Sequence, residues 1–158
     1  MEIKFDVKMT VPVMYDYMMY CTLTAAQFWI AVAMGIMLIA VFAVNHNPLY
    51  IIAGLVVIVY LPIERYIQAK KQIALNPVFK ETLSYTVTED KMSIDVLEEH
   101  MDAEWSSLVK VRSTKKSLIL YTNRVAATIF PKEALGSDYD KVVEIIKRKV
   151  PAGKVKIK

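Results

Sequence analysis

Two long apolar runs near the N-terminus constrain this chain more than any other feature. Residues 25–44 and 48–63 contain no Asp, Glu, Lys or Arg, and only residues 45–47 separate them. A helix of about twenty residues is about 30 Å long, which is the thickness of the hydrocarbon core of a bilayer. The second run is shorter, but Arg65 can extend it because its long side chain reaches the interface. The sequence therefore predicts a transmembrane hairpin over residues 25–63.

The alternative is that both runs are core helices of a soluble protein. Such helices are rarely apolar on every side, and two of them rarely follow each other across so short a turn. We therefore prefer the membrane-spanning interpretation.

Basic residues predict the orientation of the hairpin. The turn at 45–47 carries no Lys or Arg, whereas both outer flanks are basic. Short flanking segments rich in Lys and Arg stay on the cytoplasmic side. We therefore expect a multi-pass membrane protein with both termini in the cytoplasm. The flanking basic residues are Lys4, Lys8, Arg65, Lys70, Lys71 and Lys80.

Outside the hairpin, the chain divides into three segments. Residues 1–24 begin with apolar side chains at every second position from Ile3 to Met9, which predicts a strand, and a short helix follows it. Because a lone strand is unstable, we expect it to join the sheet of the C-terminal domain. Residues 64–79 are expected to form a juxtamembrane helix and linker, and residues 80–158 a cytoplasmic domain.

The C-terminal domain has the pattern of an α+β fold. Short β-runs come first and an amphipathic helix over residues 137–150 follows, so we expect an antiparallel meander or small barrel covered by one helix. Residues 98–100 predict a turn, and the tail after residue 151 is either a frayed end or an edge strand. The expected strands are 83–88, 91–97, 101–107, 108–113, 117–122 and 125–130.

Several motifs of this domain resemble those of a known family. They are Tyr85 with Asp90, Trp105 before Leu108 and Val111, Leu118 with Leu120, and Phe130-Pro131-Lys132. With the hairpin before them, their order resembles the YcxB-like family of bacterial membrane proteins over nearly the whole chain. The resemblance implies a domain similar to the pleckstrin-homology (PH) fold, a strongly bent antiparallel sheet closed by a C-terminal helix. It supplies no catalytic residues.

The sequence contains no motif for catalysis, for a cofactor or for a metal. Cys21 is the only cysteine, and His46 and His100 are far apart, so we expect no metal ligands. His100 lies among four carboxylates, for which a solvated hairpin tip is a better explanation than a carboxylate–imidazole pair. We expect Trp105 to be a core residue. The four carboxylates belong to Glu98, Glu99, Asp102 and Glu104.

Six basic residues are candidates for contact with the membrane surface. A cation beside an anionic leaflet contributes ~1 kcal/mol, so these residues could hold the domain against anionic lipid headgroups. The alternative is an ordinary solvated surface, where cations at a helix end also complement the helix dipole. Nucleic-acid binding is disfavoured, because Arg is scarce and the charges are of mixed sign. The candidates are Arg65, Lys70, Lys71, Lys154, Lys156 and Lys158.

These observations favour a non-enzymatic, membrane-anchored interaction module that binds a protein, a peptide or a lipid headgroup at the cytoplasmic face. A second hypothesis is an oligomeric membrane component that assists transport or a stress response, because small residues in both helices permit close packing. The third is a membrane-tethered enzyme without a recognisable motif. The expected partners are the lipid bilayer, an unknown protein and, under the second hypothesis, further copies of the chain.

Overall fold

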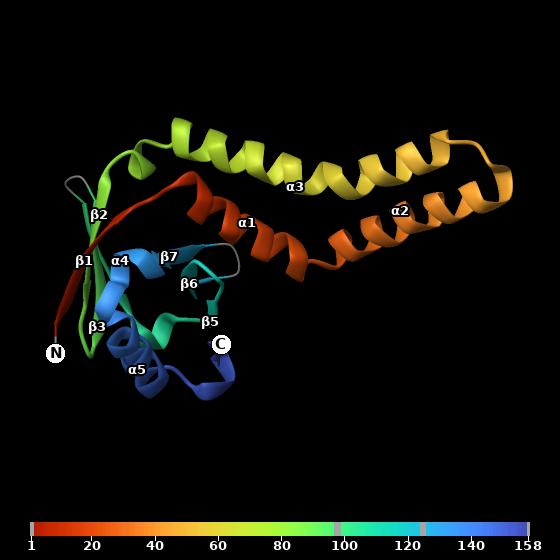
Figure 1. The fold of residues 1–158 in the computed structure, drawn as a ribbon. Helices are drawn as coiled ribbons and strands as arrows, with labels where there is room; N and C mark the ends of the chain where they lie inside the picture. The colour runs from red at the N-terminus through yellow and green to blue at the C-terminus, as the bar shows by residue number, and fades with distance from the viewer. Residues whose placement is uncertain (1, 97–98, 124–125, 158) are drawn as a thin grey trace.

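A long pair of helices projects from a part of the molecule that is built of sheets and short helices (Figure 1). The computed structural model describes residues 2–96, 99–123 and 126–157. The chain begins with strand β1 (Ile3–Lys8) and helix α1 (Val11–Thr24). It then runs out and back along the pair of helices before the remaining strands follow (Figure 1).

The projecting pair consists of α2 (Ala26–Asn45) and α3 (Leu49–Leu75), which lie antiparallel to each other. Both helices are long and apolar enough to cross a membrane, as the two apolar runs predict. The second helix does not end with its apolar run, because it continues past Pro62 as far as Leu75. The expected juxtamembrane helix is therefore the last part of α3 itself.

Gly35 of α2 and Gly54 of α3 set the distance between the two helices. A Cβ atom on Gly54 would lie 2.6 Å from the carbonyl oxygen of Gly35, which is closer than real side chains approach a backbone oxygen. A Cβ atom on Gly35 would lie 2.7 Å from Cγ1 of Ile58 and 3.0 Å from the carbonyl oxygen of Gly54. The helices are this close because neither residue has a side chain.

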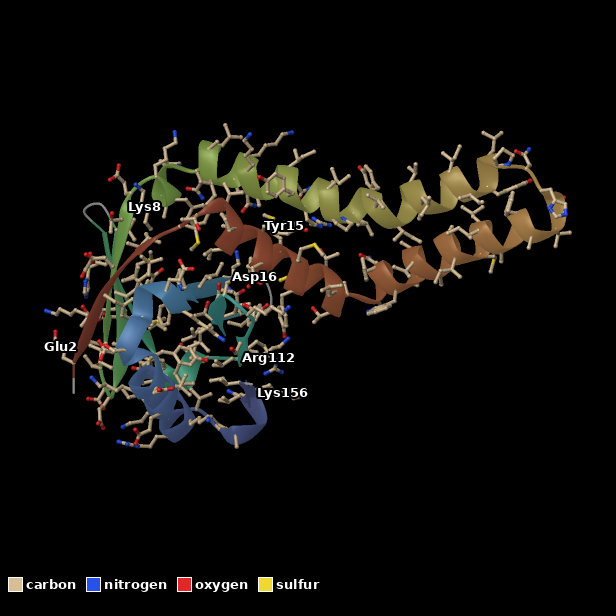
Figure 2. The ribbon with its side chains drawn as sticks, viewed as in Figure 1. Glu2, Lys8, Tyr15, Asp16, Arg112 and Lys156 are labelled. Carbon is tan, nitrogen blue, oxygen red and sulfur yellow. The ribbon has the colours of Figure 1, made fainter. Side chains whose placement is uncertain are left out.

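Helix α1 packs between α3 and the sheets (Figures 1 and 2). The carboxylate of Asp16 accepts a hydrogen bond from the hydroxyl of Thr114. One turn further along, Sγ of Cys21 lies 3.6 Å from the hydroxyl of Tyr121. Ala25 then adopts an extended conformation, which ends α1 and lets the chain change direction before α2. These contacts fix the helical pair against the rest of the molecule.

The first of two four-stranded sheets contains β1. Its order is β1-β2-β3-β4, with β2 (Thr82–Val87), β3 (Lys91–Val96) and β4 (Glu99–Glu104), and all neighbouring strands are antiparallel. All six residues of β1 pair with β2. The prediction that the N-terminal strand joins the sheet is confirmed, and the helical pair is an insertion between two adjacent strands.

The second sheet has the order β7-β6-β5-β8. The pairs β5–β6 and β6–β7 are antiparallel, whereas β8 is parallel to β5. The tail therefore ends in an edge strand, which is one of its two expected states. The strands are β5 (Lys110–Ser113), β6 (Ser117–Tyr121), β7 (Ala127–Pro131) and β8 (Val155–Lys156).

Two open sheets thus replace the single bent sheet that the family resemblance implied. The break lies at the 3-10 turn Trp105–Ser107, which ends β4 where the sequence predicted that the strand continues. The hydroxyl of Ser107 donates to the carbonyl oxygen of Glu104 at 2.7 Å, and such local bonds compete with strand pairing. The indole N–H of Trp105, which is buried as predicted, donates to the carbonyl oxygen of Thr88 at 3.0 Å.

Short helices complete the fold. Helix α4 (Lys132–Leu135) follows β7, and α5 (Tyr139–Lys149) buries its apolar stripe in the core. The helix covers the core but does not close the sheets, because β4 and β7 are each the last strand of a sheet. The remaining 3-10 turns are Pro77–Phe79, Gly136–Asp138 and Ala152–Lys154.

Three aromatic rings join the two sheets. Phe5 of β1 stacks on Tyr85 of β2 with the ring centroids 5.6 Å apart. Phe130 of β7 meets Phe5 edge-on at 5.0 Å and lies 4.9 Å from Tyr85. Burial raises the pKa of Tyr85 to about 12, because the phenolate would be poorly solvated there. The strand that precedes the hairpin is therefore part of the same core as the strands that follow it.

We predict that shortening a core residue of β1 destabilises the sheets. Val7 is fully buried, so Val7→Ala is expected to lower the free energy of unfolding by roughly 1.5–3 kcal/mol. Lys8→Ala, on the exposed face of the same strand, is the control and should change it by less than about 0.5 kcal/mol. Fluorescence of Trp105 in a Trp29→Phe background follows unfolding in detergent. Equal stability of the two variants would contradict the shared core.

We also predict that a single methyl group forces the two long helices apart. Gly54→Ala is expected to cost roughly 1–3 kcal/mol, because its Cβ collides with backbone. The same change at Gly153, where a Cβ meets nothing within 4 Å, is the control. Reversible unfolding by sodium dodecyl sulfate in mixed micelles, followed by circular dichroism, measures both. A Gly54 variant as stable as the Gly153 variant would refute the contact.

Candidate functional site: an open trench between the two sheets

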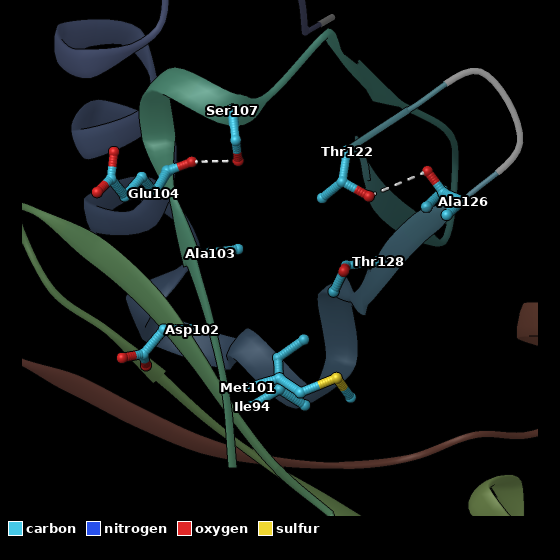
Figure 3. Close-up of a pocket in the computed structure, with 10 residues that line it drawn as sticks. Ile94, Met101, Asp102, Ala103, Glu104, Ser107, Thr122, Ala126 and Thr128 are labelled. Carbon is cyan, nitrogen blue, oxygen red and sulfur yellow. Dashed lines mark hydrogen bonds between the residues drawn. The ribbon is translucent and has the colours of Figure 1, made fainter.

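An open trench lies between the edge of the first sheet and the edge of the second (Figure 3). Its volume is about 520 Å³, within the range of small-molecule and peptide sites. β4 forms one wall, and β7 with the end of β6 forms the other. The side chains that line it are mostly small or apolar. They include Ile94, Met101 and Ala103 on one side and Thr122, Ala126 and Thr128 on the other.

Met101 is a large apolar side chain of the trench that is exposed to solvent. It is 52% exposed although it lies on the inner face of a β-strand. Methionine is flexible and polarisable, and it is common on surfaces that bind partners of varied shape. An exposed Met above the half-buried Ile94 therefore offers an adaptable apolar contact.

The alternation of the β-ladder identifies the free backbone groups of β4. The N–H of Thr88 donates to the carbonyl oxygen of Lys91 at 3.0 Å, so odd-numbered residues of β3 bond to β2 and even-numbered ones bond to β4. The partners of these even-numbered residues are the odd-numbered residues of β4. His100, Asp102 and Glu104 therefore direct their backbone N–H and C=O groups away from the sheet.

The edge of β7 is free by the same reasoning. The N–H of Thr122 donates to the carbonyl oxygen of Ala126 at 3.2 Å, and the register then turns the backbone groups of the even-numbered residues of β7 toward β6. The backbone N–H and C=O groups of Ala127 and Ile129 therefore point away from the sheet. In the part of the chain that the structure describes, no further strand pairs with β4 or β7 on these sides. The trench thus lies between two unpaired backbone edges.

A network of polar side chains covers the outer face of β3 and β4. Asp102 accepts hydrogen bonds from Lys91 at 2.5 Å and from Ser93 at 2.6 Å. His100 bridges the carboxylate of Asp95 and that of Asp102, with Nε2 lying 3.1 Å from Asp102. Of the four carboxylates that the sequence analysis grouped with His100, Asp102 contacts the ring, and Asp95, which was not in that group, is its other partner. His100 lies in β4 and not in the predicted turn, which corrects that prediction.

The network shifts two pKa values in opposite directions. Hydrogen bonding and attraction to Asp95, with a smaller effect of Asp102, raise the pKa of His100. Hydrogen bonds from Lys91 and Ser93 lower the pKa of Asp102 to about 2. Lys91, Asp95, His100 and Asp102 are solvent-exposed, whereas Ser93 is buried. Glu98 of the predicted acidic tip lies outside the described residues. Among the residues that are described, no cluster of His, Cys, Asp and Glu is arranged to hold a metal.

Comparison with known proteins concerns this same part of the chain. The family model described as YcxB-like protein matches residues 87–146. No curated protein and no solved structure matches the chain. Residues 87–146 are thus similar to the YcxB-like family, and this segment is called the YcxB-like domain below. The family resemblance is confirmed for this segment, which runs from the end of β2 into α5 and contains both walls of the trench.

The structure does not bring the predicted basic contact residues into one patch. Lys70 and Lys71 are exposed on α3, on one side of the YcxB-like domain. Lys156 is exposed on β8, on the side away from α3 (Figures 1 and 2). Lys158 lies outside the described residues. These basic residues therefore do not lie on one face of the molecule that could contact a membrane surface through all of them at once.

Two of the candidates are held by neighbouring groups. Arg65 donates to the side-chain oxygen of Gln68 at 2.9 Å, and its Nε lies 3.6 Å from the carboxylate of Glu64. The ammonium group of Lys154 donates to the carbonyl oxygen of Leu108 at 2.9 Å and is half-buried. Lys154 therefore fastens the tail to the YcxB-like domain instead of reaching outward.

The sequence analysis did not identify the trench of the YcxB-like domain. Its walls come from segments that are separated by the break at Trp105, and the expected strands ran through that break. One signal was available: Met101 and Ala103 are apolar residues that alternate with His100 and Asp102. This alternation indicates a strand with an apolar inner face, but it does not reveal that the face is left uncovered.

We predict that His100 titrates above its ordinary pKa of 6.5. The raised pKa means that its stabilising contribution is present below pH 6.5 and is lost as the pH rises through the raised value. The lowered pKa of Asp102 acts oppositely: its contribution is present above pH 3.8 and is lost as the pH falls toward 2. NMR of the His100 ring protons against pH measures the midpoint.

Asp95→Asn should lower this midpoint, because it removes the main partner of the ring. Glu144→Gln, which removes a carboxylate paired with Arg148 on α5, is the control and should leave it unchanged. A midpoint at or below pH 6.5 in the parent protein would show that the network does not form in solution.

Proposed function

We propose that the protein is a non-enzymatic, membrane-anchored interaction module whose trench binds a protein or a peptide. The observation that carries the proposal is the trench itself, an apolar hollow between two backbone edges that remain free to form hydrogen bonds. Extended peptides bind at such edges in many interaction domains. A lipid headgroup is a poorer occupant, because most headgroups that recruit proteins are anionic and the trench is bordered by Asp102 and Glu104.

The anchor in this proposal is the pair α2 and α3, which crosses the bacterial cytoplasmic membrane as a hairpin. The lack of Lys and Arg in the turn at 45–47, compared with the basic flanks, supports a topology with both termini in the cytoplasm. The sheets and the trench then face the cytoplasm. The order of strands β1 to β7 followed by α5 also supports a PH-like relationship, with the hairpin inserted between the first two strands.

The proposal predicts that a partner polypeptide can be cross-linked from inside the trench. A photo-crosslinking amino acid is placed at Met101 or Thr128 of the full chain in its own membrane, and at Lys147 on the exposed side of α5 as the control. We expect discrete polypeptide adducts from both trench positions and none from the control. Adducts from all three positions alike, or only with lipid, would overturn the proposal.

A further inference from the structure

The free edge of β4 presents hydrogen-bonding groups at a fixed repeat. Its outward-facing residues are His100, Asp102 and Glu104, so the groups recur every second residue, about 6.8 Å apart. Only a second extended chain presents N–H and C=O groups at this repeat. The carbonyl oxygen of Glu104 accepts a hydrogen bond from the hydroxyl of Ser107. The other outward-facing N–H and C=O groups of this edge pair with no strand among the described residues.

The two faces of β4 differ in chemistry, and an added strand would meet both. Its side chains on the trench side would lie beside Met101 and Ala103, which favours apolar residues. Its side chains on the outer side would lie beside Asp102 and Glu104, here called the acidic rim. The Glu104 carboxylate accepts a hydrogen bond from Ser106 at 3.0 Å and has no ion pair within the described ranges. A basic residue of the added strand, opposite the acidic rim, would form an ion pair with Glu104.

A second copy of β4 is disfavoured as the occupant by charge. Two copies of the edge paired with each other would place carboxylates of Asp102 and Glu104 beside those of the other chain, and like charges opposite each other destabilise a sheet. Inward or edge carboxylates are a common device against such self-pairing. The same charges attract a basic strand.

The protein contains one example of a basic strand at a sheet edge. In β8, Val155 packs against the core and Lys156 is exposed, and the strand pairs with β5. Ile157, the next residue, also packs against the core. In this strand, Lys alternates with β-branched residues that face the core, which is the pattern expected of a strand added to the β4 edge.

We infer that the partner binds as an extended strand added to the free edge of β4, with apolar residues toward the trench and basic residues toward the acidic rim. This inference rests on the proposed function, because it specifies how the trench is occupied. It identifies the partner by its chemistry, namely a segment in which Lys or Arg alternates with an apolar residue.

The test uses the full chain in nanodiscs of phosphatidylcholine, a zwitterionic lipid without net charge, so that a cationic peptide has no anionic lipid to bind. The probe is a fluorescent decapeptide of alternating valine and lysine, and its counterpart has glutamate in place of lysine. We expect saturable binding of the lysine peptide and at least tenfold weaker binding of the glutamate peptide. Glu104→Lys should weaken the lysine peptide several-fold, whereas Glu144→Lys on α5 should not.

Backbone methylation distinguishes strand addition from binding through side chains alone. N-methyl groups are placed on all lysines in one peptide and on all valines in another. A strand on the β4 edge directs only one of these sets toward β4, so one peptide should lose at least tenfold in affinity and the other should not. In an antiparallel strand the sensitive set is the lysines, and in a parallel strand it is the valines.

Equal effects of the two methylation patterns, or no saturable binding of the lysine peptide at about 1 mM, would overturn the inference. Either result leaves the proposed function standing if the trench positions still yield polypeptide adducts in the membrane. Loss of those adducts would overturn both the inference and the proposed function. Trp105 fluorescence of each variant verifies that the domain is folded, because this residue is buried in the core.

Discussion

The pairing of β1 with β2 is the interaction on which the rest of the structure depends. These strands are neighbours in the sheet although residues 9–81 separate them in the chain. Closing so long a loop costs conformational entropy, but the cost grows only slowly with length. The helical pair lowers it further, because α2 and α3 pack closely at Gly35 and Gly54 and so return the chain to its starting point. The sheet and the helical pair therefore stabilise each other.

The insertion of the long helices between β1 and β2 also fixes how the sheets are oriented relative to those helices. Helix α1 is bonded to the second sheet at Asp16 and lies beside it at Cys21, and it packs along α3. A domain on a flexible linker could turn freely, whereas this one is attached through a strand at one end of the insertion and a helix along its side. The direction in which the trench opens is consequently fixed by the same contacts that hold the helical pair.

The sequence predicted those elements whose environment is the same along a whole segment. A long apolar helix and an alternating strand record the same environment at every turn or every second residue, so α2, α3 and β1 follow from the pattern. The end of β4 at Trp105 depends on a local bond, that between Ser107 and Glu104. Periodicity does not contain this information.

The sequence pattern did not predict the trench for a related reason. The trench exists because, among the described residues, no further strand pairs with the outer edges of β4 and β7. Lys154 illustrates the same limit at a single residue. Its charge and its place beside Lys156 indicated an outward-facing cation, yet its ammonium group is bonded to the carbonyl oxygen of Leu108. A carbonyl oxygen is present at every residue, so no composition or spacing marks the one that a lysine will find.

An exposed edge strand carries a risk of aggregation, and β4 manages it with charge instead of a covering element. The pKa of Asp102 is lowered to about 2, so this carboxylate stays ionised throughout the range in which cells live. Lys91 and Ser93 secure that ionisation from the neighbouring strand without occupying the edge itself. The edge is therefore guarded by a permanent negative charge while its backbone remains accessible. Like charges on two copies of this edge would repel each other, which disfavours pairing of β4 with itself.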